Sequence, residues 1–377
     1  MTTIERSTAV DPMVAPRLPT GIDTPAVVID LDIVERNARR LGGALAARGI
    51  ALRPHAKTHK SVALAQIQLA AGAHGLTVGT VGEAEVFAAA GLDDLFIAYP
   101  VWAEGPKAAR LRALHEIAAL RLAVGFDSIE GARRLAAAVA GSRRPLAVML
   151  ELDPGNRRTG APAERAGEIA AAARDAGLDV QGVFTHGGHS YGHGAAGPAG
   201  ADEVATLAKG AAAVAAEGIE PAVISAGSTP TQLTAATAPV NEIRAGTYLI
   251  GDRQQWAIGA VPGDGVAIAV AATVVSAAVG GQVVIDAGAK TLTKDVASYL
   301  TGHGLLPAYP EAVLERVSDY HGVVQIPPGT PSPSVGEVVV VIPNHVCPVI
   351  DLRDSFIATR DGEIVGVWPV DARGRSG

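Results

Sequence analysis

The sequence predicts an α/β protein, in which an N-terminal (β/α)8 barrel is followed by a C-terminal, mainly-β domain. Two observations support this fold class. Between about residues 21 and 258, amphipathic stretches alternate with nearly continuous apolar ones, as expected of parallel strands buried on both faces. After residue 258 the helical periodicity fades, and Gly, Pro and Asp turns separate the apolar runs. A chain of 377 residues is also long enough for two domains.

The expected elements of the barrel follow one another in order. The expected strands are 26–29, 50–52, 75–78, 95–98, 121–126, 146–152, 180–184, 222–225 and 242–244. A first helix is capped by Asp32 with Glu35 and closed by Gly49, and later helices are expected at 61–71, 84–90, 107–118, 128–140, 163–176 and 201–216. About eight repeats match a barrel. A doubly wound open sheet is the alternative, but no Gly-x-Gly-x-x-Gly follows the first strand.

The remaining chain supplies the second domain. Strands are expected at 266–275, 282–285, 322–325 and 338–342. Residues 1–20 contain several prolines and no periodicity, so they form an N-terminal arm that is expected to join the β domain. The predicted division is therefore 1–20 for the arm, 21–258 for the barrel and 259–377 for the β domain.

The composition excludes several classes of protein. Apolar residues make up 48% and charged residues 18%, which indicates a folded protein with a large core. A net charge of -7 argues against nucleic-acid binding, which needs a basic surface. No signal peptide or membrane-spanning stretch is recognisable, so a cytoplasmic protein is expected. The single cysteine, Cys347, excludes an intrachain disulfide.

The stretch Arg53-Pro54-His55-Ala56-Lys57-Thr58-His59-Lys60 is the first candidate for chemistry. It follows an expected strand, and α/β folds place their active sites where strands open into loops. A lysine among other cations can lose its proton and attack a carbonyl as a Schiff-base former. The alternative is a basic loop that stays solvated.

Polar stretches follow the later strands as well, and they suggest a phosphate site. These stretches are 153–160, 186–191, 227–229 and 244–248. Gly227-Ser228-Thr229 and Gly246-Thr247-Tyr248 offer backbone N–H groups and hydroxyls at turns, which is typical of a phosphate cradle. A reactive lysine at one strand end with a phosphate cradle at others is the arrangement that pyridoxal phosphate requires.

Six motifs make the chain resemble the D-threonine aldolase and D-serine dehydratase family. They are Thr24-Pro25-Ala26, the basic stretch 53–60, Gly188-His189-Ser190-Tyr191, the stretch 244–248, the stretch Asp286 to Lys290, and Pro343-Asn344-His345-Val346-Cys347-Pro348. The resemblance covers nearly the whole chain. It implies the alanine racemase-like fold, fold type III, and a homodimer.

The resemblance also assigns roles. It implies that Lys57 holds pyridoxal 5'-phosphate. It further implies cofactor contacts from the remaining predicted site residues of the barrel, which are His55, Arg158, Tyr191, Gly227, Ser228, Thr229, Gly246, Thr247 and Tyr248.

His345 and Cys347 are the predicted metal ligands. Alternate residues at a strand end point to the same side, and imidazole with thiolate favours zinc. In the family this position supplies histidine followed two residues later by aspartate or cysteine. The resemblance therefore implies a divalent metal, Zn2+ or Mn2+, with positions left for substrate.

The implied activity is that of a lyase for D-3-hydroxy amino acids. Lys57, His59 and His189 are the predicted catalytic residues, with His186 or metal-bound water as other candidate bases. Retro-aldol cleavage to glycine and an aldehyde is preferred, and elimination to a keto acid and ammonia is the alternative. Cys347 is the variant associated more with dehydratases, and the run 318–322 carries one acidic residue where the family has two. An amino-acid racemase and a non-catalytic pyridoxal phosphate carrier are more distant alternatives.

Overall fold

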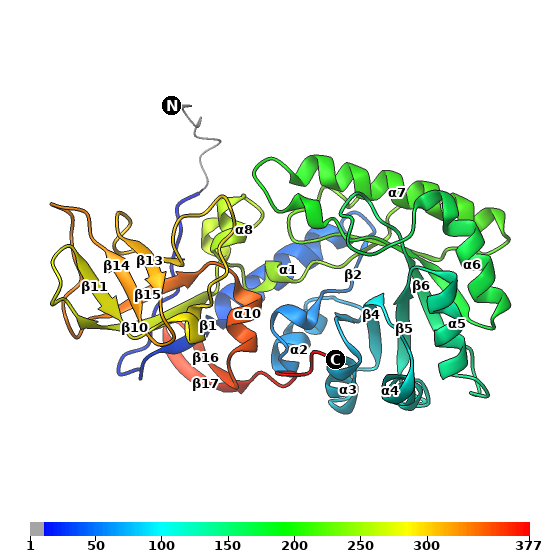
Figure 1. The fold of residues 1–377 in the computed structure, drawn as a ribbon, viewed down its shortest axis with the longest axis horizontal. Coiled ribbons are helices and arrows are strands. Elements are labelled where there is room, and N and C mark those ends of the chain that lie inside the picture. The colour runs from blue at the N-terminus through cyan, green and yellow to red at the C-terminus, as the bar shows by residue number, and fades with distance from the viewer. Residues whose placement is uncertain (1–10) are drawn as a thin grey trace. The chain divides into compact units, whose positions relative to one another are not determined.

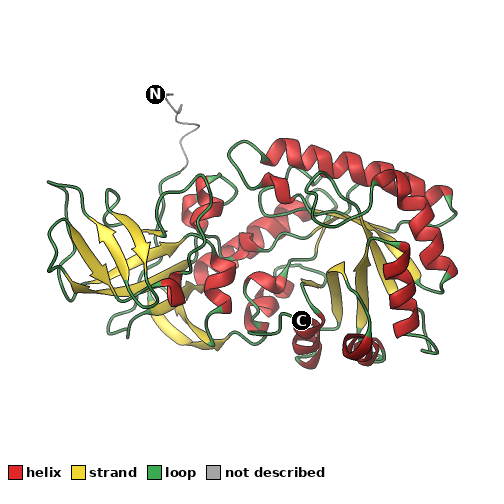
Figure 2. Cartoon of the chain, viewed as in Figure 1, coloured by secondary structure: helices red, strands yellow, loops and turns green. Residues whose placement is uncertain are grey.

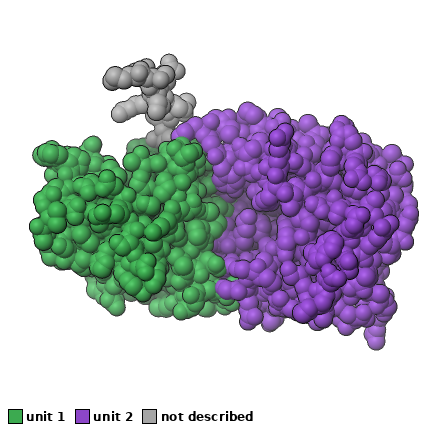
Figure 3. All heavy atoms as spheres, in the orientation of Figure 1, with its two compact units in different colours: residues 1–39, 247–373 green, residues 40–246, 374–377 purple. Residues whose placement is uncertain are grey.

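The structure is a computed structural model that describes residues 11–377. It divides into two compact units, which Figure 3 shows in different colours. The β unit comprises, of the described residues, 11–39 together with Thr247–Arg373. The barrel unit comprises Arg40–Gly246 and Gly374–Gly377.

The barrel unit contains a sheet of eight parallel strands, in the order β2-β9-β8-β7-β6-β5-β4-β3. The strands are β2 (Ala51–Leu52), β3 (Leu76–Val78), β4 (Asp94–Pro100), β5 (Arg121–Phe126), β6 (Ala147–Glu151), β7 (Asp179–Phe184), β8 (Val223–Ala226) and β9 (Glu242–Ile243). A parallel bridge between His55 and Thr77 joins the two ends of this order, as a closed barrel requires. The predicted barrel is confirmed.

Helices cover the outside of these strands (Figures 1 and 2). They are α2 (Val62–Ala70), α3 (Val81–Ala89), α4 (Gly105–His115), α5 (Ile129–Ala138), α6 (Ala166–Asp175) and α7 (Ala196–Ala216), with short 3-10 turns at Ala56–Thr58, Ala163–Arg165 and Gly188–Ser190. The Thr80 and Ser128 side chains accept the backbone N–H of Glu83 and Gly131, which caps α3 and α5. Helix α1 (Leu31–Ala46) contains the point at which the units divide. Its N-terminus is capped by Asp30, whose carboxylate accepts from Asp32 and Ile33, and not by Asp32 as predicted.

The interior of the barrel is built around an aromatic cluster. Phe96 and Phe184 meet edge to face with ring centroids 5.0 Å apart, and Met149 packs against them. All three side chains are buried. These residues come from β4, β6 and β7, so the apolar runs of the sequence meet inside the barrel.

The β unit contains a nine-stranded sheet. Its strands are β1 (Ala26–Asp30), β10 (Ile268–Ser276), β11 (Gln282–Ile285), β12 (Gly304–Leu305), β13 (Val313–Val317), β14 (Gly322–Gln325), β15 (Val338–Pro343), β16 (Ser355–Arg360) and β17 (Glu363–Pro369). Its helices are α8 (Arg253–Ala257), α9 (Ala289–Leu292) and α10 (Val346–Asp351), with 3-10 turns at Thr247–Leu249 and Gly263–Gly265. The predicted mainly-β domain is confirmed.

The prediction that 26–29 is the first strand of the barrel is wrong. This stretch is β1, which pairs antiparallel with β10 and parallel with β16 in the β unit. A continuous apolar run suits a central strand of either sheet, so its pattern does not tell which sheet it joins.

The division between the units accordingly differs from the predicted 21–258 and 259–377. Of the predicted arm 1–20, residues 1–10 lie outside the described residues. Within the β unit, the Val14 N–H donates to the carbonyl of Gly263 at 3.1 Å. Trp256 Nε1 donates to the carbonyl of Asp11 at 2.8 Å. Across residues 11–377, no helix is long and apolar enough to cross a membrane.

Candidate active site

The basic stretch 53–60 leaves strand β2 and distributes its side chains in several directions. His55 is half-buried and caps the 3-10 turn Ala56–Thr58, with Nδ1 3.4 Å from the backbone N of Lys57. Lys57 lies inside this turn and is exposed. The turn therefore presents the Lys57 amine at the carboxyl-terminal end of β2, where a barrel places its chemistry.

His59 and Lys60 point elsewhere. His59 is fully buried, with Nε2 3.1 Å from Gln68 Oε1 and Nδ1 accepting the Ser61 N–H at 3.1 Å. Burial lowers the pKa of His59 to about 4 despite these hydrogen bonds, so the imidazole is neutral. Lys60 Nζ lies 3.6 Å from Glu83 Oε1, and both side chains are buried. The structure thus separates His59 from Lys57 and excludes a solvent-facing Lys60.

The loops after β6 and β7 supply further candidates. His186 is half-buried and faces Tyr191, with ring centroids 6.5 Å apart. His189 Nε2 lies 3.2 Å from Asp202 Oδ2, whereas its buried Nδ1 has no hydrogen-bond partner in the described part of the chain. Arg158 is exposed after β6.

Two histidines at the carboxyl-terminal end of the barrel, its mouth, are neutral chiefly because they are buried, and nearby cations add to this effect. Burial lowers the pKa of His55 and of His186 well below 6.5, and the charges of Lys57 and Arg244 lower both further. Arg158 contributes to the pKa of His186 in the same direction. The mouth therefore combines three cations with imidazoles that can accept a proton.

Arg244 belongs to this mouth, although the sequence reasoning did not select it as a site residue. Its buried guanidinium donates to Ser225 Oγ and to the carbonyl of Thr185. The guanidinium also stands 5.1 Å from the ring centroid of Phe184. Its place in the motif 244–248 is the sequence signal that could have identified Arg244 as a site residue.

Glu151, at the end of β6, is a buried acid beside these cations. Burial raises its pKa to about 7, although Thr159 and Arg158 act in the opposite direction. Thr159 Oγ1 donates to Oε1 at 3.0 Å, while Oε2 has no hydrogen-bond partner among residues 11–377.

The predicted phosphate cradle after β8 is held by an acid that sequence reasoning missed. The carboxylate of Glu203, from α7, is fully buried and accepts the N–H groups of Gly187 and Gly227, each at 3.0 Å. Gly227 adopts a φ of +100°, which only glycine adopts readily. The Ser228 N–H donates to Thr231 Oγ1 at 2.9 Å. The N–H groups of Gly227 and Ser228 therefore make hydrogen bonds within the protein that hold the turn in place.

The other cradle residues lie nearby in the chain or after β9. Ser228 Oγ lies 3.0 Å from Ser190 Oγ, and both residues are buried, as is Thr229. A Cβ at Gly246 would lie 2.9 Å from the carbonyl oxygen of His55 and from Thr58 Oγ1, so only glycine allows this close approach. Thr247 and Tyr248 continue the chain into the β unit and are buried there.

The cations of the mouth fit an anionic cofactor. Lys57, Arg158 and Arg244 act on the same two imidazoles, and an anion such as a phosphate ester would offset this positive charge. The glycine turns at 227 and 246 bring backbone close to the same strand ends. Lys57 supplies the amine that a Schiff base with pyridoxal phosphate requires.

The predicted metal ligands lie in the β unit. Strand β15 ends at Pro343, His345 is the extended N-cap residue of α10, and Cys347 is in the first turn of that helix. The expectation of alternating residues on a strand end is therefore wrong. The His345 and Cys347 side chains nevertheless meet, because a hydrogen bond joins them.

Acidic residues surround this pair. His345 Nδ1 lies 2.5 Å from Asp295 Oδ2. Burial lowers the pKa of His345, but Cys347, Asp252 and Asp295 together raise it to about 10. Burial raises the pKa of Asp252 to about 6. An imidazole and a thiol that converge among carboxylates fit a divalent cation, and this donor set suits zinc.

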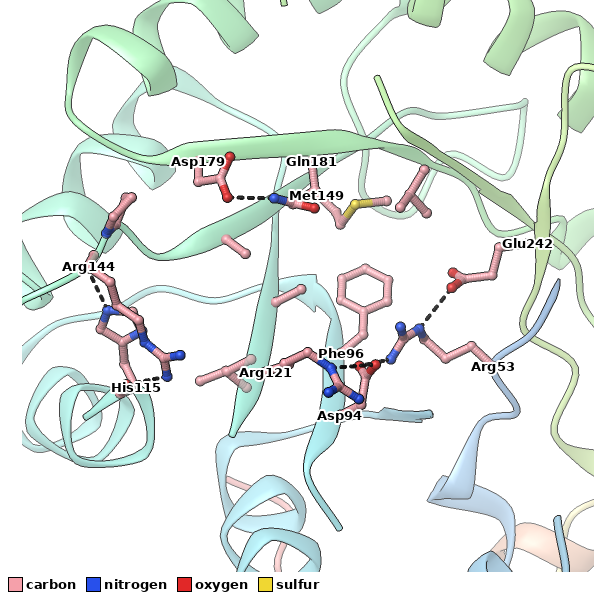
Figure 4. A pocket seen from close by; sticks show the side chains of 15 residues that line it. Arg53, Asp94, Phe96, His115, Arg121, Arg144, Met149, Asp179, Gln181 and Glu242 are labelled. Atoms are coloured by element: carbon pink, nitrogen blue, oxygen red, sulfur yellow. Dashed lines mark hydrogen bonds and ion pairs between the residues drawn. The ribbon is translucent and has the colours of Figure 1, made fainter. Parts of the chain in front are cut away.

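One cavity of the barrel does not coincide with these residues. It has a volume of about 420 Å³ and is lined by the first residues of six barrel strands, which are Asp94, Arg121, Ala147, Asp179, Val223 and Glu242. It therefore opens at the amino-terminal end of the strands. Figure 4 shows Arg53 pointing into it between Asp94 and Glu242. The Arg53 side chain thus lies at the amino-terminal end of the barrel, where residues serve stability rather than catalysis.

The comparisons with known proteins agree with this arrangement. Residues 29–254 match the family of the alanine racemase N-terminal domain, and residues 267–359 match the serine dehydratase domain family. The chain is 32% identical to a D-threonine aldolase of Arthrobacter sp. over 387 residues, which cover 98% of both chains.

Two further relatives support the same assignment. A D-threo-3-hydroxyaspartate dehydratase of Delftia sp. is 35% identical over 350 residues, covering 86% of this chain and 91% of the relative. The solved structure of a D-threonine aldolase from Filomicrobium marinum superposes with a TM-score of 0.86 at 31% identity, covering 96% of this chain and 99% of that one. The chain therefore belongs to the family of pyridoxal phosphate-dependent lyases with the alanine racemase fold that includes the D-threonine aldolases and the D-3-hydroxyaspartate dehydratases.

Proposed function

We propose that the protein is a pyridoxal phosphate- and divalent metal-dependent lyase that cleaves D-3-hydroxy amino acids by a retro-aldol reaction, as a D-threonine aldolase does. The observation that carries this proposal is the hydrogen-bonded pair His345 and Cys347 among acidic residues. A lyase for 3-hydroxy amino acids can use a metal on the substrate hydroxyl, whereas a racemase on the same fold needs none.

In the barrel, Lys57 holds the cofactor and the cations around it bind the anionic groups. The cofactor, when bound, takes up the electrons released at the α carbon of the substrate. Arg158 and Arg244 attract the phosphate and the substrate carboxylate. The turn Gly227-Ser228-Thr229 has the N–H groups of its first two residues engaged within the protein, so Thr229 is the residue of this turn proposed to contact the phosphate. Gly246 with Thr247 is the second proposed phosphate turn, and His55, Tyr191 and Tyr248 complete the proposed cofactor contacts.

A neutral imidazole removes the proton from the β-hydroxyl oxygen. Of the candidate histidines, we assign this role to His186, which is half-buried beside Tyr191 and is neutral because of burial and the charges of Lys57 and Arg158. An anionic cofactor would offset these charges and raise its basicity. His189 is the second candidate, while both nitrogens of His59 are engaged in hydrogen bonds. The products of the cleavage are glycine and an aldehyde.

In the β unit, His345 and Cys347 hold the divalent metal. Zn2+ fits the imidazole and thiolate donors, and Mn2+ is the alternative. When bound, the metal lowers the pKa of the substrate hydroxyl. Asp295 and Asp252 supply negative charge beside the cation.

Elimination is the second candidate reaction, favoured by Cys347 and by the similarity to the Delftia dehydratase. Lys57 would then take the proton from the α carbon, and the hydroxyl would leave. The products are water and an enamine, which hydrolyses to a keto acid and ammonia. The same residues serve both reactions, so the products have to be measured.

Incubation with single substrates tests the proposal. The protein is supplied with pyridoxal phosphate and Zn2+ or Mn2+, and D-threonine and D-serine are added separately. Glycine with acetaldehyde from D-threonine supports the proposed cleavage, whereas keto acid with ammonia supports elimination. Undiminished activity after treatment with a chelator would contradict the proposed metal dependence and favour a racemase. Inertness toward all D-3-hydroxy amino acids would favour a non-catalytic carrier of the cofactor.

We also propose that the protein is a cytoplasmic homodimer. The resemblance to the family supports the dimer, and the single cysteine, which allows no intrachain disulfide, is consistent with a reducing compartment. Light scattering coupled to size-exclusion chromatography should give twice the chain mass of 38.2 kDa.

A further inference from the structure

The imidazole of His345 is held between two side chains of different kinds. Its Nδ1 lies 2.5 Å from Asp295 Oδ2, and a second hydrogen bond joins it to the thiol of Cys347. The His345 side chain is 32% exposed and that of Asp295 is 46% exposed. Since Nδ1 faces the carboxylate, Nε2 is the nitrogen that remains for a metal.

The backbones of Asp295 and His345 are tied together through Asn344, so their contact is not that of two independent surface side chains. Asn344 is fully buried, and its Nδ2 donates to the carbonyls of Asp295 and Gly302 at 3.1 and 2.9 Å. Its Oδ1 accepts from Arg253 Nη1 at 3.1 Å. The residue before His345 therefore fixes the position of the loop that carries Asp295.

The residue after His345 is anchored as well. The backbone N–H of Val346 donates to Asp252 Oδ2 at 2.9 Å, and the other oxygen of Asp252 accepts the N–H of Gln255 at 2.8 Å. Asp252 is fully buried. With both neighbours held, the backbone at His345 is fixed, and the contact with Asp295 restrains the orientation of its side chain.

A carboxylate on Nδ1 prepares an imidazole for metal binding. It keeps the proton on Nδ1, leaves the lone pair on Nε2, orients the ring and makes Nε2 a stronger donor. A partly exposed ion pair contributes little to folding stability, so stability alone does not account for this contact.

We propose that Asp295 is a positioning residue of the metal centre, which orients His345 so that Nε2 and the Cys347 thiolate bind one divalent metal. This inference rests on the metal site of the proposed function. Among residues 11–377, no three His, Cys, Asp or Glu side chains gather as a ready ligand set. Asp295 acts through His345, because its carboxylate contacts Nδ1 and leaves Nε2 for the metal.

Metal affinity, measured without substrate, tests this role. Zn2+ binding to the full-length protein is followed by competition with a chromophoric chelator for the wild type, Asp295→Ala, Asp295→Asn and the control Asp319→Asn. Asp319 is an exposed loop acid paired with Lys290. Asp295→Ala should bind Zn2+ about 10–100-fold more weakly, as expected for an outer partner of a ligand. Asp295→Asn should lose less, because its amide oxygen can still accept from Nδ1, and Asp319→Asn should match the wild type.

A second readout separates positioning from direct ligation and from misfolding. With Co2+ in place of Zn2+, a thiolate-to-cobalt charge-transfer band reports the bond to Cys347. This band should persist in Asp295→Ala at saturating Co2+, and the melting temperature should stay near that of the wild type. Zn2+ affinity unchanged in Asp295→Ala, or loss of the cobalt band in a folded variant, would overturn the inference while leaving the proposed lyase intact. Absence of Zn2+ binding by the wild type would overturn both.

Discussion

The two units of the chain provide opposite electrostatic environments for their candidate site residues. In the barrel unit, the side chains come from the ends of five strands, β2, β6, β7, β8 and β9, and cations predominate. In the β unit, they come from one helix start and one loop, and carboxylates surround them. Each unit therefore suits a ligand of the opposite charge, an anionic cofactor in the barrel and a metal cation in the β unit.

Histidine shows the consequence of this difference. Burial and the neighbouring cations lower the pKa of His186 well below 6.5. At His345, burial acts in the same direction, but Cys347 and two aspartates raise the pKa to about 10. Histidine is therefore neutral at position 186 in the barrel unit, whereas at position 345 in the β unit its protonated form is stabilised by a thiol and two carboxylates.

The largest expected effect comes from removing the amine of the barrel. Lys57→Ala should lose at least about 10³-fold in activity, since a residue that bonds covalently to the reacting system has no substitute. It should also lose the visible absorbance band of a cofactor bound as a Schiff base. Spectra of the reconstituted protein and product assays check both expectations.

Lys60 provides the matched control, because it lies three residues away and is paired with Glu83. Lys60→Met should keep the cofactor band and instead lower stability by about 1–3 kcal/mol, since it leaves a buried carboxylate unpaired. A band that persisted in Lys57→Ala and vanished in Lys60→Met would reverse the assignment of the two lysines.

The next largest effect is expected in the β unit. His345→Ala should reduce metal affinity by more than about 100-fold, since even an outer partner of a metal ligand is worth roughly 10–100-fold. The cofactor band should remain, because the β unit does not supply Lys57. Loss of the band together with the metal would show that the two functions are not divided between the units. Metal titration and absorbance spectra on the same sample make the comparison.

Much of the barrel was predictable because its signals are local. Each barrel strand was found within a few residues of its bounds, since parallel strands buried on both faces are short apolar runs between amphipathic helices. Assignment of β1 failed, because which sheet a run joins depends on its partners β10 and β16, which are distant in sequence. Helix α10 was missed, since it has only six residues and contains Pro348.

The candidate site was predictable only where motifs mark it. Lys57, His345 and Cys347 stand in recognisable motifs. The structure places Lys57 in the turn after β2, and His345 and Cys347 at the start of α10. Glu203 and Asp295 carry no such mark, because each acts through partners far away in the chain. His59 was selected for its position beside Lys57, yet the 3-10 turn directs it toward Gln68.

Substitution of Arg53 tests the ion pairs at the amino-terminal end of the barrel. Arg53→Met should lower stability by about 3–5 kcal/mol, because it leaves the buried Glu242 without its arginine and removes one of the two arginines that pair with the half-buried Asp94. In the β unit, Arg360→Met removes a half-exposed partner of Asp32 and should cost no more than about 1 kcal/mol. Urea unfolding of both variants measures the contrast. Equal losses would mean that the barrel network is as well solvated as the surface pair.

The last expected effect is one of pH at Glu151 in the barrel. Its pKa is raised from the ordinary value of 4.5 to about 7, chiefly by burial. Between these two pH values the folded state holds a proton that the unfolded chain has lost. The stabilisation is therefore complete below pH 4.5 and is lost as the pH rises through 7. At about 1.4 kcal/mol for each pH unit, the ceiling is about 3 kcal/mol.

Glu151→Gln removes this titration and keeps an oxygen for the Thr159 hydroxyl. The wild-type profile alone does not isolate Glu151, because His59 acts with the opposite sign. Its pKa of about 4 gives stability that is present above pH 6.5 and lost as the pH falls toward 4. His59 is common to both proteins, so it cancels in the difference between variant and wild type. That difference in unfolding free energy should shift in favour of Glu151→Gln by up to about 3 kcal/mol between pH 4.5 and 8, and a difference independent of pH would mean that Glu151 is ionised throughout.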